Sequence, residues 1–254
     1  MKRVLVTNDD GIMAAGIQAL VNVVKDLAEV TVVAPDREKS ATGHCITVHC
    51  PLRVDEVELP GAAGGAWAVD GTPSDCVKLA VQSLMKQPPD LVVSGINRGA
   101  NLGTDVLYSG TVSAAIEGII NGIPSIAVSL NTFDKPDFTY AAKFTKKLVS
   151  YLFANGLTVD TLLNVNIPAI PEQEIKGVSV AKLGNRKYDN LFERRTDPRG
   201  KSYFWMGGKV VDVHNDPDSD VAAMQRGEVS VTPIHFDLTN YRIMDEVKKW
   251  ILEP

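Results

Sequence analysis

Two adjacent aspartates, Asp9 and Asp10, follow an apolar run at residues 4–6 and precede Gly11. In an open parallel sheet, ligands bind outside the carboxyl ends of the strands, so carboxylates in this place indicate a function. One aspartate would suffice to cap the next helix, but a second carboxylate beside it adds repulsion that a cation or a proton must relieve. The pair therefore predicts a divalent metal site, with helix capping as the simpler alternative.

Two later turns offer neutral oxygen atoms to the same cation. Ser40 closes a polar turn after one expected strand, and Asn97 lies in a long glycine-bearing loop, residues 95–105, after another. Carboxylate, hydroxyl and amide oxygens suit Mg²⁺ or Mn²⁺, whereas zinc favours imidazoles and thiolates. We predict that Asp9, Asp10, Ser40 and Asn97 hold one Mg²⁺ or Mn²⁺ per subunit, and that the two aspartates and Asn97 are catalytic.

A phosphate site is expected beside this cation. Ser109, Gly110 and Thr111 open a helical pattern, and the free N–H groups and dipole at a helix start favour an anion. Asn101, in the preceding loop, is assigned to the same phosphate, while a plain N-cap role for Ser109 is the alternative. A cation beside a phosphate pocket is suited to phosphoryl transfer or phosphate-ester hydrolysis, in which the metal polarises the phosphoryl oxygen and positions water.

A parallel sheet is needed to bring these turns together. Strand patterns at residues 4–6, 30–34, 66–69, 91–94, 124–130 and 162–167 alternate with helical patterns, and residues 44–59 read as extended pieces. We expect an α/β fold with a three-layer, doubly wound, mostly parallel, Rossmann-like sheet. Thr72, Pro73 and Asp75 have the types and spacing of a helix N-cap, a first helical residue and a reciprocal capping residue.

The pattern changes after residue 184. Two extended segments, 186–194 and 201–206, flank a turn-rich centre and predict a projecting aromatic hairpin. A short helix at 218–226, a strand at 229–233 and a terminal helix with Val247, Trp250 and Ile251 are expected to follow. We predict one domain over residues 1–254, with a catalytic core at 1–183 and a hairpin and helix extension at 184–254. The aromatic rings pack either on their own domain or against another subunit, and exposed apolar patches favour at least a dimer.

Composition excludes several classes of partner. The 254 residues carry a formal net charge of -5, which provides no basic field for a nucleic-acid polymer. Cys45, Cys50 and Cys76 lack zinc-site spacing and fit reduced thiols, and no apolar run is long enough for a membrane helix. His44 and His49 have no acidic or thiol partner at a ligand spacing, so they are assigned no metal. We expect a cytoplasmic protein without a membrane partner.

Five segments, taken in order, closely resemble the stationary-phase survival protein SurE family. They are 6–11 (VTNDDG), 34–40 (APDREKS), 71–77 (GTPSDCV), 93–103 (VSGINRGANLG) and 108–115 (YSGTVSAA). The resemblance implies a divalent-metal-dependent 5′-nucleotidase, a phosphatase that converts nucleoside 5′-monophosphates to nucleoside and phosphate by metal-activated water. It places Asp9, Asp10, Ser40 and Asn97 on the family's metal ligands, and residues 109–111 on its phosphate segment. The family's habit also implies a homodimer or homotetramer.

Two other functions stay open at this point. In an aspartyl-phosphate phosphatase Asp9 or Asp10 would attack phosphorus directly, but such enzymes carry an Asp-x-Asp spacing that is missing here. A non-catalytic receiver-like signalling domain would use Asp70 as its phosphate acceptor. Such a domain is smaller, and it needs a lysine where this chain has residues 129–131 (SLN).

Overall fold

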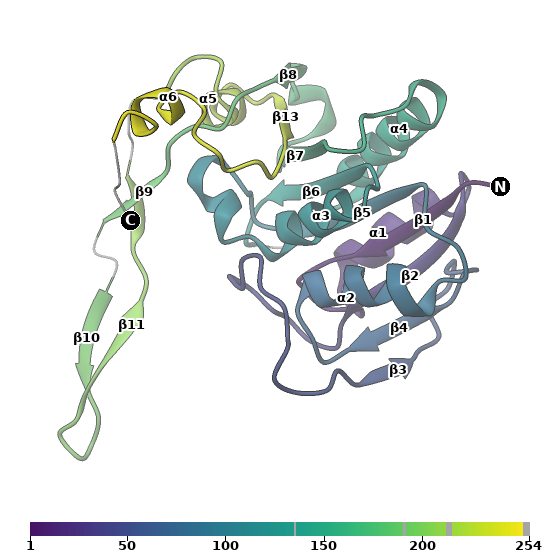
Figure 1. The fold of residues 1–254 in the computed structure, drawn as a ribbon, viewed down its shortest axis with the longest axis horizontal. Coiled ribbons are helices and arrows are strands. Elements are labelled where there is room, and N and C mark those ends of the chain that lie inside the picture. Colours follow the sequence, from purple (N-terminus) through teal and green to yellow (C-terminus); the bar gives the residue numbers. More distant parts are fainter. Residues whose placement is uncertain (135, 190–191, 212–214, 251–254) are drawn as a thin grey trace.

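A nine-stranded sheet forms the centre of the computed structural model, which describes residues 1–134, 136–189, 192–211 and 215–250 (Figure 1). Six neighbouring strands run parallel, from β4 to β7 in the spatial order. At the two edges β3 is antiparallel to β4, β13 is antiparallel to β7, and β8 is parallel to β13. The strands in spatial order are β3 (Val54–Glu56), β4 (Ala66–Val69), β2 (Glu29–Pro35), β1 (Arg3–Thr7), β5 (Leu91–Arg98), β6 (Ser125–Asn131), β7 (Leu162–Pro168), β13 (Val229–Ile234) and β8 (Val178–Val180).

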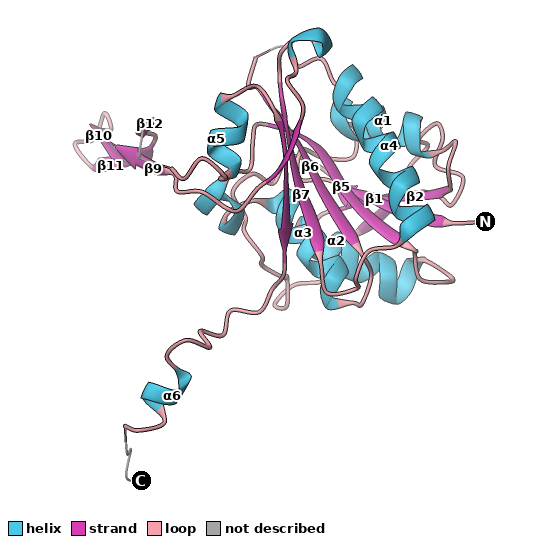
Figure 2. Ribbon diagram, turned by 90° about the horizontal axis from the view of Figure 1, so that it is seen from above, coloured by secondary structure: helices cyan, strands magenta, loops and turns pink. Residues whose placement is uncertain are grey.

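Helices cover both faces of this sheet, which confirms the predicted three-layer α/β architecture (Figure 2). The helices α1 (Ala15–Val24) and α4 (Thr139–Asn155) cover one face, and α2 (Pro73–Leu79), continued by a π-helical turn (Ala80–Leu84), covers the other with α3 (Gly110–Ile120). Alternate residues of β1 belong to different cores: Val4 and Val6 pack towards α1, and Leu5 packs towards α2. No helix in the described ranges is long and apolar enough to cross a membrane.

Local sequence signals explain how several elements begin. Thr72 caps α2 through its side chain, which accepts from the Asp75 N–H, and the Asp75 carboxylate accepts from the Thr72 N–H at 2.9 Å. Pro73 occupies the first helical position. This arrangement confirms the predicted capping box.

The parallel register brings three predicted turns to one edge of the sheet. Val6 is paired with Val32 and Thr7 with Ser94, so β1, β2 and β5 end at the same side. β5 is longer than predicted and includes Asn97, which lies beside Ser129 of β6 after a register shift. The expected loop 95–105 is therefore partly strand, and the 3₁₀ turn η2 (Gly103–Leu107) follows it. Within residues 44–59, where extended pieces are expected, β3 is the strand.

A two-part β arm projects from the body, as the sequence predicted (Figure 1). Its strands pair as β9 (Lys187–Asp189) with β12 (Lys209–Val211), and as β10 (Phe192–Thr196) with β11 (Ser202–Met206). The arm is longer than expected because β12 extends it to Val211. Its aromatic side chains are all exposed, namely Tyr188, Phe192, Tyr203, Phe204 and Trp205.

The base of the arm is held against the body by two acidic side chains. Asp105 of η2 accepts from Arg186 Nη1 at 2.8 Å and from the Tyr188 hydroxyl at 2.6 Å. Asp220, which is fully buried, accepts from the N–H groups of Gly103 and Gly184, both at 2.8 Å. These contacts tie the arm to the loop that leads into α3.

The last two helices are shorter than predicted. The helix expected at 218–226 is α5 (Asp220–Gln225), which Ser219 caps by accepting from the Ala222 N–H. The terminal helix α6 (Met244–Val247) ends before Trp250, and Ile251 lies outside the described residues.

Candidate metal and phosphate site

The turn after β1 holds the two aspartates in a fixed conformation. The Asn8 side chain donates to the Gly11 carbonyl at 2.9 Å and accepts from the Gly11 N–H at 3.2 Å. Gly11 has a φ of +100°, and a Cβ there would lie 3.2 Å from the carbonyl carbon of Arg37. Glycine is therefore required at this position for both its backbone angle and its lack of a side chain.

Asp9 is almost completely buried, with 6 % of its surface exposed. Its Oδ1 atom accepts a hydrogen bond from the Thr111 hydroxyl at 2.5 Å. Burial raises the pKa of Asp9 to about 6; the Thr111 hydroxyl opposes this rise, and the charge of Asp10 adds to it. The Asp9 carboxylate is thus placed where its negative charge is costly unless a proton or a cation joins it.

The segment after β2 and the end of β5 both contact the aspartate turn. The Lys39 N–H donates to the carbonyl of Asp9 at 2.7 Å, and the Arg98 N–H donates to Asp10 Oδ2 at 3.2 Å. Each donor is the immediate chain neighbour of one of the predicted neutral ligands. The three segments that carry the four predicted metal ligands therefore meet at this edge of the sheet.

Each of the two predicted neutral ligands donates a hydrogen bond to a nearby residue of its own segment. The Ser40 hydroxyl donates to Glu38 Oε1 at 2.6 Å, and the Asn97 amide nitrogen donates to the Gly99 carbonyl at 2.8 Å. Because each side chain donates in this way, the lone pairs of the Ser40 hydroxyl oxygen and the Asn97 amide oxygen stay free of these bonds and are the atoms that a cation could use.

This donor set fits a hard divalent cation. Among the residues that the structure describes, no three or more His, Cys, Asp or Glu side chains group to hold a metal ion. A cation at the aspartate turn would therefore depend on two carboxylates and on neutral oxygens, which Mg²⁺ and Mn²⁺ accept. The buried charge of Asp9, raised in pKa beside Asp10, is the structural reason to expect one.

The predicted phosphate segment lies directly against Asp9. Ser109 is the N-cap of α3, and its hydroxyl accepts from the Val112 N–H at 3.1 Å. This is the plain capping role that the sequence offered as the alternative to phosphate binding. A Cβ on Gly110 would lie 2.8 Å from Asp9 Cβ and 2.9 Å from Asp9 Oδ2. An anion at this helix start would thus sit beside a carboxylate, and a cation is needed to stabilise both.

Asn101 is directed elsewhere. Its side-chain nitrogen donates to Ser129 Oγ at 2.8 Å, and its backbone carbonyl accepts from the amides of Asn164 and Asn166 at 2.8 and 3.0 Å. The described contacts join Asn101 to β6 and β7, and none joins it to the aspartate turn. Gly110 and Thr111 lie beside Asp9, whereas Asn101 has no described contact with the aspartate turn. The assignment of Asn101 to the phosphate stays a prediction.

Two acidic side chains near the site were missed by the sequence reasoning. Glu38 orients Ser40, and its charge adds to the burial that raises the pKa of Asp10. Glu117 of α3 is buried and pairs with His44 Nε2 and Lys78 Nζ, both at 3.0 Å. Glu117 is a single carboxylate in an otherwise uncharged, mostly apolar helix. This pattern could have indicated that Glu117 is buried with partners, because buried charges require them.

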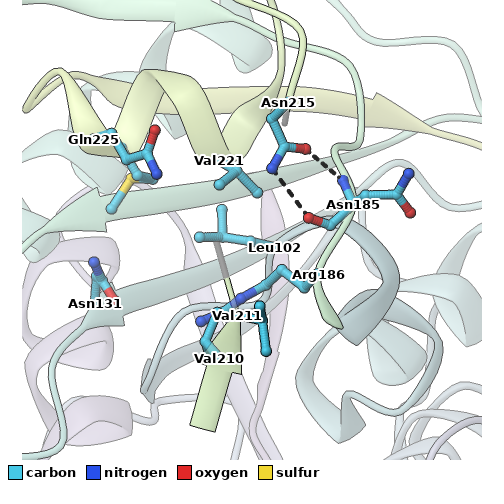
Figure 3. Close-up of a pocket in the computed structure, with 10 residues that line it drawn as sticks. Leu102, Asn131, Asn185, Arg186, Val210, Val211, Asn215, Val221 and Gln225 are labelled. Atoms are coloured by element: carbon cyan, nitrogen blue, oxygen red, sulfur yellow. Dashed lines mark hydrogen bonds between the residues drawn. The ribbon is translucent and has the colours of Figure 1, made fainter. Parts of the chain in front are cut away.

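A cavity of about 200 Å³ lies at the base of the arm (Figure 3). Leu102, Val221 and Arg186 are among its lining residues, and Asn131 and Gln225 lie on another side of it (Figure 3). None of the eight predicted site residues lines this cavity. The candidate metal and phosphate site is therefore identified from the oxygen atoms that it offers, and this cavity is not part of it.

Comparisons with known proteins agree with the resemblance seen in the sequence. A family model described as "Survival protein SurE" matches residues 4–190. A protein named 5′-nucleotidase SurE from Heliobacterium modesticaldum is 57% identical over 98% of this chain and 92% of its own length. Its namesake from Pelotomaculum thermopropionicum is 58% identical over 97% and 94%. The crystal structure of a SurE protein from Aquifex aeolicus superposes with a TM-score of 0.85, 43% identity, and 97% and 98% of the two chains covered.

The raised pKa of Asp9 predicts that Mn²⁺ affinity depends on pH. Below about pH 6 the carboxyl group takes up a proton that the metal must displace, so affinity should be constant above pH 7 and about tenfold weaker at pH 5. Calorimetric titration at pH 5, 6 and 7 measures this. Equal affinity at pH 5 and pH 7 would contradict the assignment of Asp9 as a ligand. The raised pKa of Asp9 also affects the stability of the metal-free protein. Its stabilising contribution is fully present below pH 3.8, the ordinary pKa of an aspartate, and is lost as the pH rises through about 6.

The contact of Gly110 with Asp9 predicts that a side chain at residue 110 impairs two functions together. The positions of the ligands in the sequence alone predict that Gly110→Val blocks phosphate while metal binding survives. Because a Cβ would press on the Asp9 carboxylate, we instead expect Gly110→Ala to weaken both Mn²⁺ and phosphate binding about tenfold or more. Ser109→Ala, which adds no atom near Asp9, is the control and should keep its Mn²⁺ affinity. Normal Mn²⁺ binding by Gly110→Ala would refute this expectation.

Proposed function

We propose, since the chain belongs to the survival protein SurE family, that it is a 5′-nucleotidase that hydrolyses nucleoside 5′-monophosphates with the help of a divalent metal ion. The relatives' names support the reaction class, and the matched residues 4–190 contain all eight predicted site residues. The observation that supports the metal requirement is the burial of Asp9 beside Asp10 at the start of α3. The same names favour an enzyme over a non-catalytic receiver domain.

Asp9, Asp10, Ser40 and Asn97 are the proposed metal ligands. When bound, Mg²⁺ or Mn²⁺ would neutralise charge on the phosphoryl oxygens and lower the pKa of a water molecule. The Thr111 hydroxyl donates to Asp9 Oδ1. Asp9 Oδ2, the oxygen nearer Gly110, is therefore the atom that would bind the metal ion.

The first turn of α3 is the proposed phosphate site. Gly110 leaves room for an anion because it has no side chain, and the helix dipole adds a favourable field there. The phosphoryl group would then lie between this helix start and the aspartates. Such a placement would bring the phosphorus close to the proposed metal ligands.

This function predicts an order of damage among the four ligands. Asp9→Asn and Asp10→Asn each remove half of the formal ligand charge, so each variant should bind Mn²⁺ more weakly. Each should also lose far more than tenfold in AMP turnover, where tenfold corresponds to ~1.4 kcal/mol. Ser40→Ala and Asn97→Ala remove neutral ligands that water partly replaces, so they should keep residual activity at raised Mn²⁺. Calorimetry with Mn²⁺ and phosphate release from AMP measure both effects.

Asp36→Asn is the matched control, because Asp36 is an exposed aspartate that follows β2 near the same edge. It should behave as the unaltered protein. Normal metal affinity and turnover in both Asp9→Asn and Asp10→Asn would return this pair to helix capping. A phosphorylated aspartate trapped during turnover would instead favour the aspartyl-phosphate alternative.

We also propose that the arm assembles the protein into a homodimer or homotetramer. Phe192, Phe204 and Trp205 each expose more than half of their surface, and a pair of strands cannot bury such rings alone. The three unpaired cysteines fit the cytoplasm, where an enzyme acting on small nucleotides would meet its substrate.

Removing the arm should abolish this assembly. Replacing residues 187–211 by a short glycine linker, with Arg186 retained for its bond to Asp105, should convert the oligomer to a monomer on light scattering. Serine at Phe192, Phe204 and Trp205 together should weaken the assembly while the strands are kept. An unchanged mass for the deletion variant would show that the subunits associate elsewhere.

A further inference from the structure

Residues 39–47, which we call the strap, cross the starts of α2 and α3 and carry Ser40 near one end. No strand or helix lies within the strap, so its course depends on individual contacts. The Gly43 N–H donates to the Tyr108 carbonyl at 3.0 Å. The Thr47 N–H and hydroxyl donate to the Asp75 carboxylate at 2.9 and 2.7 Å. The strap is thus attached at several points to the elements that surround the proposed site.

Glu117 provides a further attachment, from within α3. The Thr72 hydroxyl, which donates to the Cys45 carbonyl, and the Lys39 N–H, which donates to the Asp9 carbonyl, also hold the strap. The Glu117 side chain is 3% exposed, and its Oε1 atom accepts from Lys78 Nζ and Asn121 Nδ2, both at 3.0 Å. Its Oε2 atom accepts from His44 Nε2, also at 3.0 Å. Lys78 already supplies the opposite charge that the buried carboxylate needs, so the second oxygen is available to hold the strap.

We propose that Glu117 is a positioning residue for Ser40, because its hydrogen bond to His44 holds the strap against α3. The inference rests on the proposed role of Ser40 as a metal ligand. His44 follows Ser40 by four residues, and α3 also carries Thr111, which fixes Asp9. One rigid helix therefore sets the place of both a charged ligand and a neutral ligand. Without this bond, the strap would keep its backbone bonds at Lys39 and Gly43 but lose the side-chain bond that joins it to α3.

A purely structural role for the pair predicts a different result. In that case the bond between His44 and Glu117 stabilises the fold, and its loss would affect every property of the protein in proportion to stability. A positioning role instead acts through Ser40 alone. The two roles are separated by asking whether the effect of changing His44 depends on the presence of the Ser40 hydroxyl.

The test is a double-mutant cycle read by Mn²⁺ calorimetry. His44→Leu removes the donor and should weaken Mn²⁺ binding about tenfold, while His44→Gln keeps an N–H at similar reach and should restore most of the affinity. In the Ser40→Ala background, His44→Leu should weaken binding less than twofold further. His49→Leu, at an exposed histidine just beyond the strap, is the control and should bind Mn²⁺ as the unaltered protein does.

Thermal unfolding shows whether each variant is folded, and the side chain of His44 is 33% exposed, so its replacement opens no buried cavity. An equal loss of Mn²⁺ affinity from His44→Leu in both backgrounds, or no loss in either, would overturn the positioning role. Failure of the unaltered protein to bind Mn²⁺ would reject the proposed function itself. Binding by the unaltered protein with an additive His44 effect would reject the positioning role alone.

Discussion

The burial of the Asp9 carboxylate against the first turn of α3 is the constraint on which the rest of the site depends. A carboxylate in this place accepts from the Thr111 hydroxyl and lies beside a second aspartate, and its pKa is raised to about 6 by burial. Such a group is costly to keep charged without a cation. The proposed metal requirement therefore rests on where the fold places the Asp9 side chain, and the neighbouring oxygens are of the kind that Mg²⁺ and Mn²⁺ accept.

Two backbone N–H groups join the neighbouring segments to the aspartate turn. The Lys39 N–H bonds the Asp9 carbonyl, and the Arg98 N–H bonds the Asp10 carboxylate. Both contacts require β1, β2 and β5 to end at the same edge, which the parallel pairing of these strands ensures. The loop from β5 to α3 is in turn fixed by Asp220, which accepts from the Gly103 N–H. The β arm is attached at this same loop through Asp105 and Asp220, so the arm and the start of α3 share a support.

The sequence predicts those features that depend on short-range signals. The alternation of strand and helix, the capping box of Thr72 and Asp75, and the convergence of strand ends are all visible in the spacing of residues. Features set by contacts between distant residues are not. His44 and Glu117 are 73 residues apart, so neither shows its partner in the sequence. Asn101 reads as a loop residue open to ligand, yet the structure directs it to Ser129 because β7 supplies two further amides beside it.

The position of a bound cation tests this account most directly. Crystals of the protein soaked with Mn²⁺ and inorganic phosphate would locate the metal by its anomalous scattering. We expect one peak about 2.1 Å from carboxylate oxygens of Asp9 and Asp10, with Ser40 and Asn97 facing it directly or through water and phosphate at the start of α3. A peak elsewhere, such as in the cavity beside Leu102 and Asn131, with none at the aspartate pair, would contradict it.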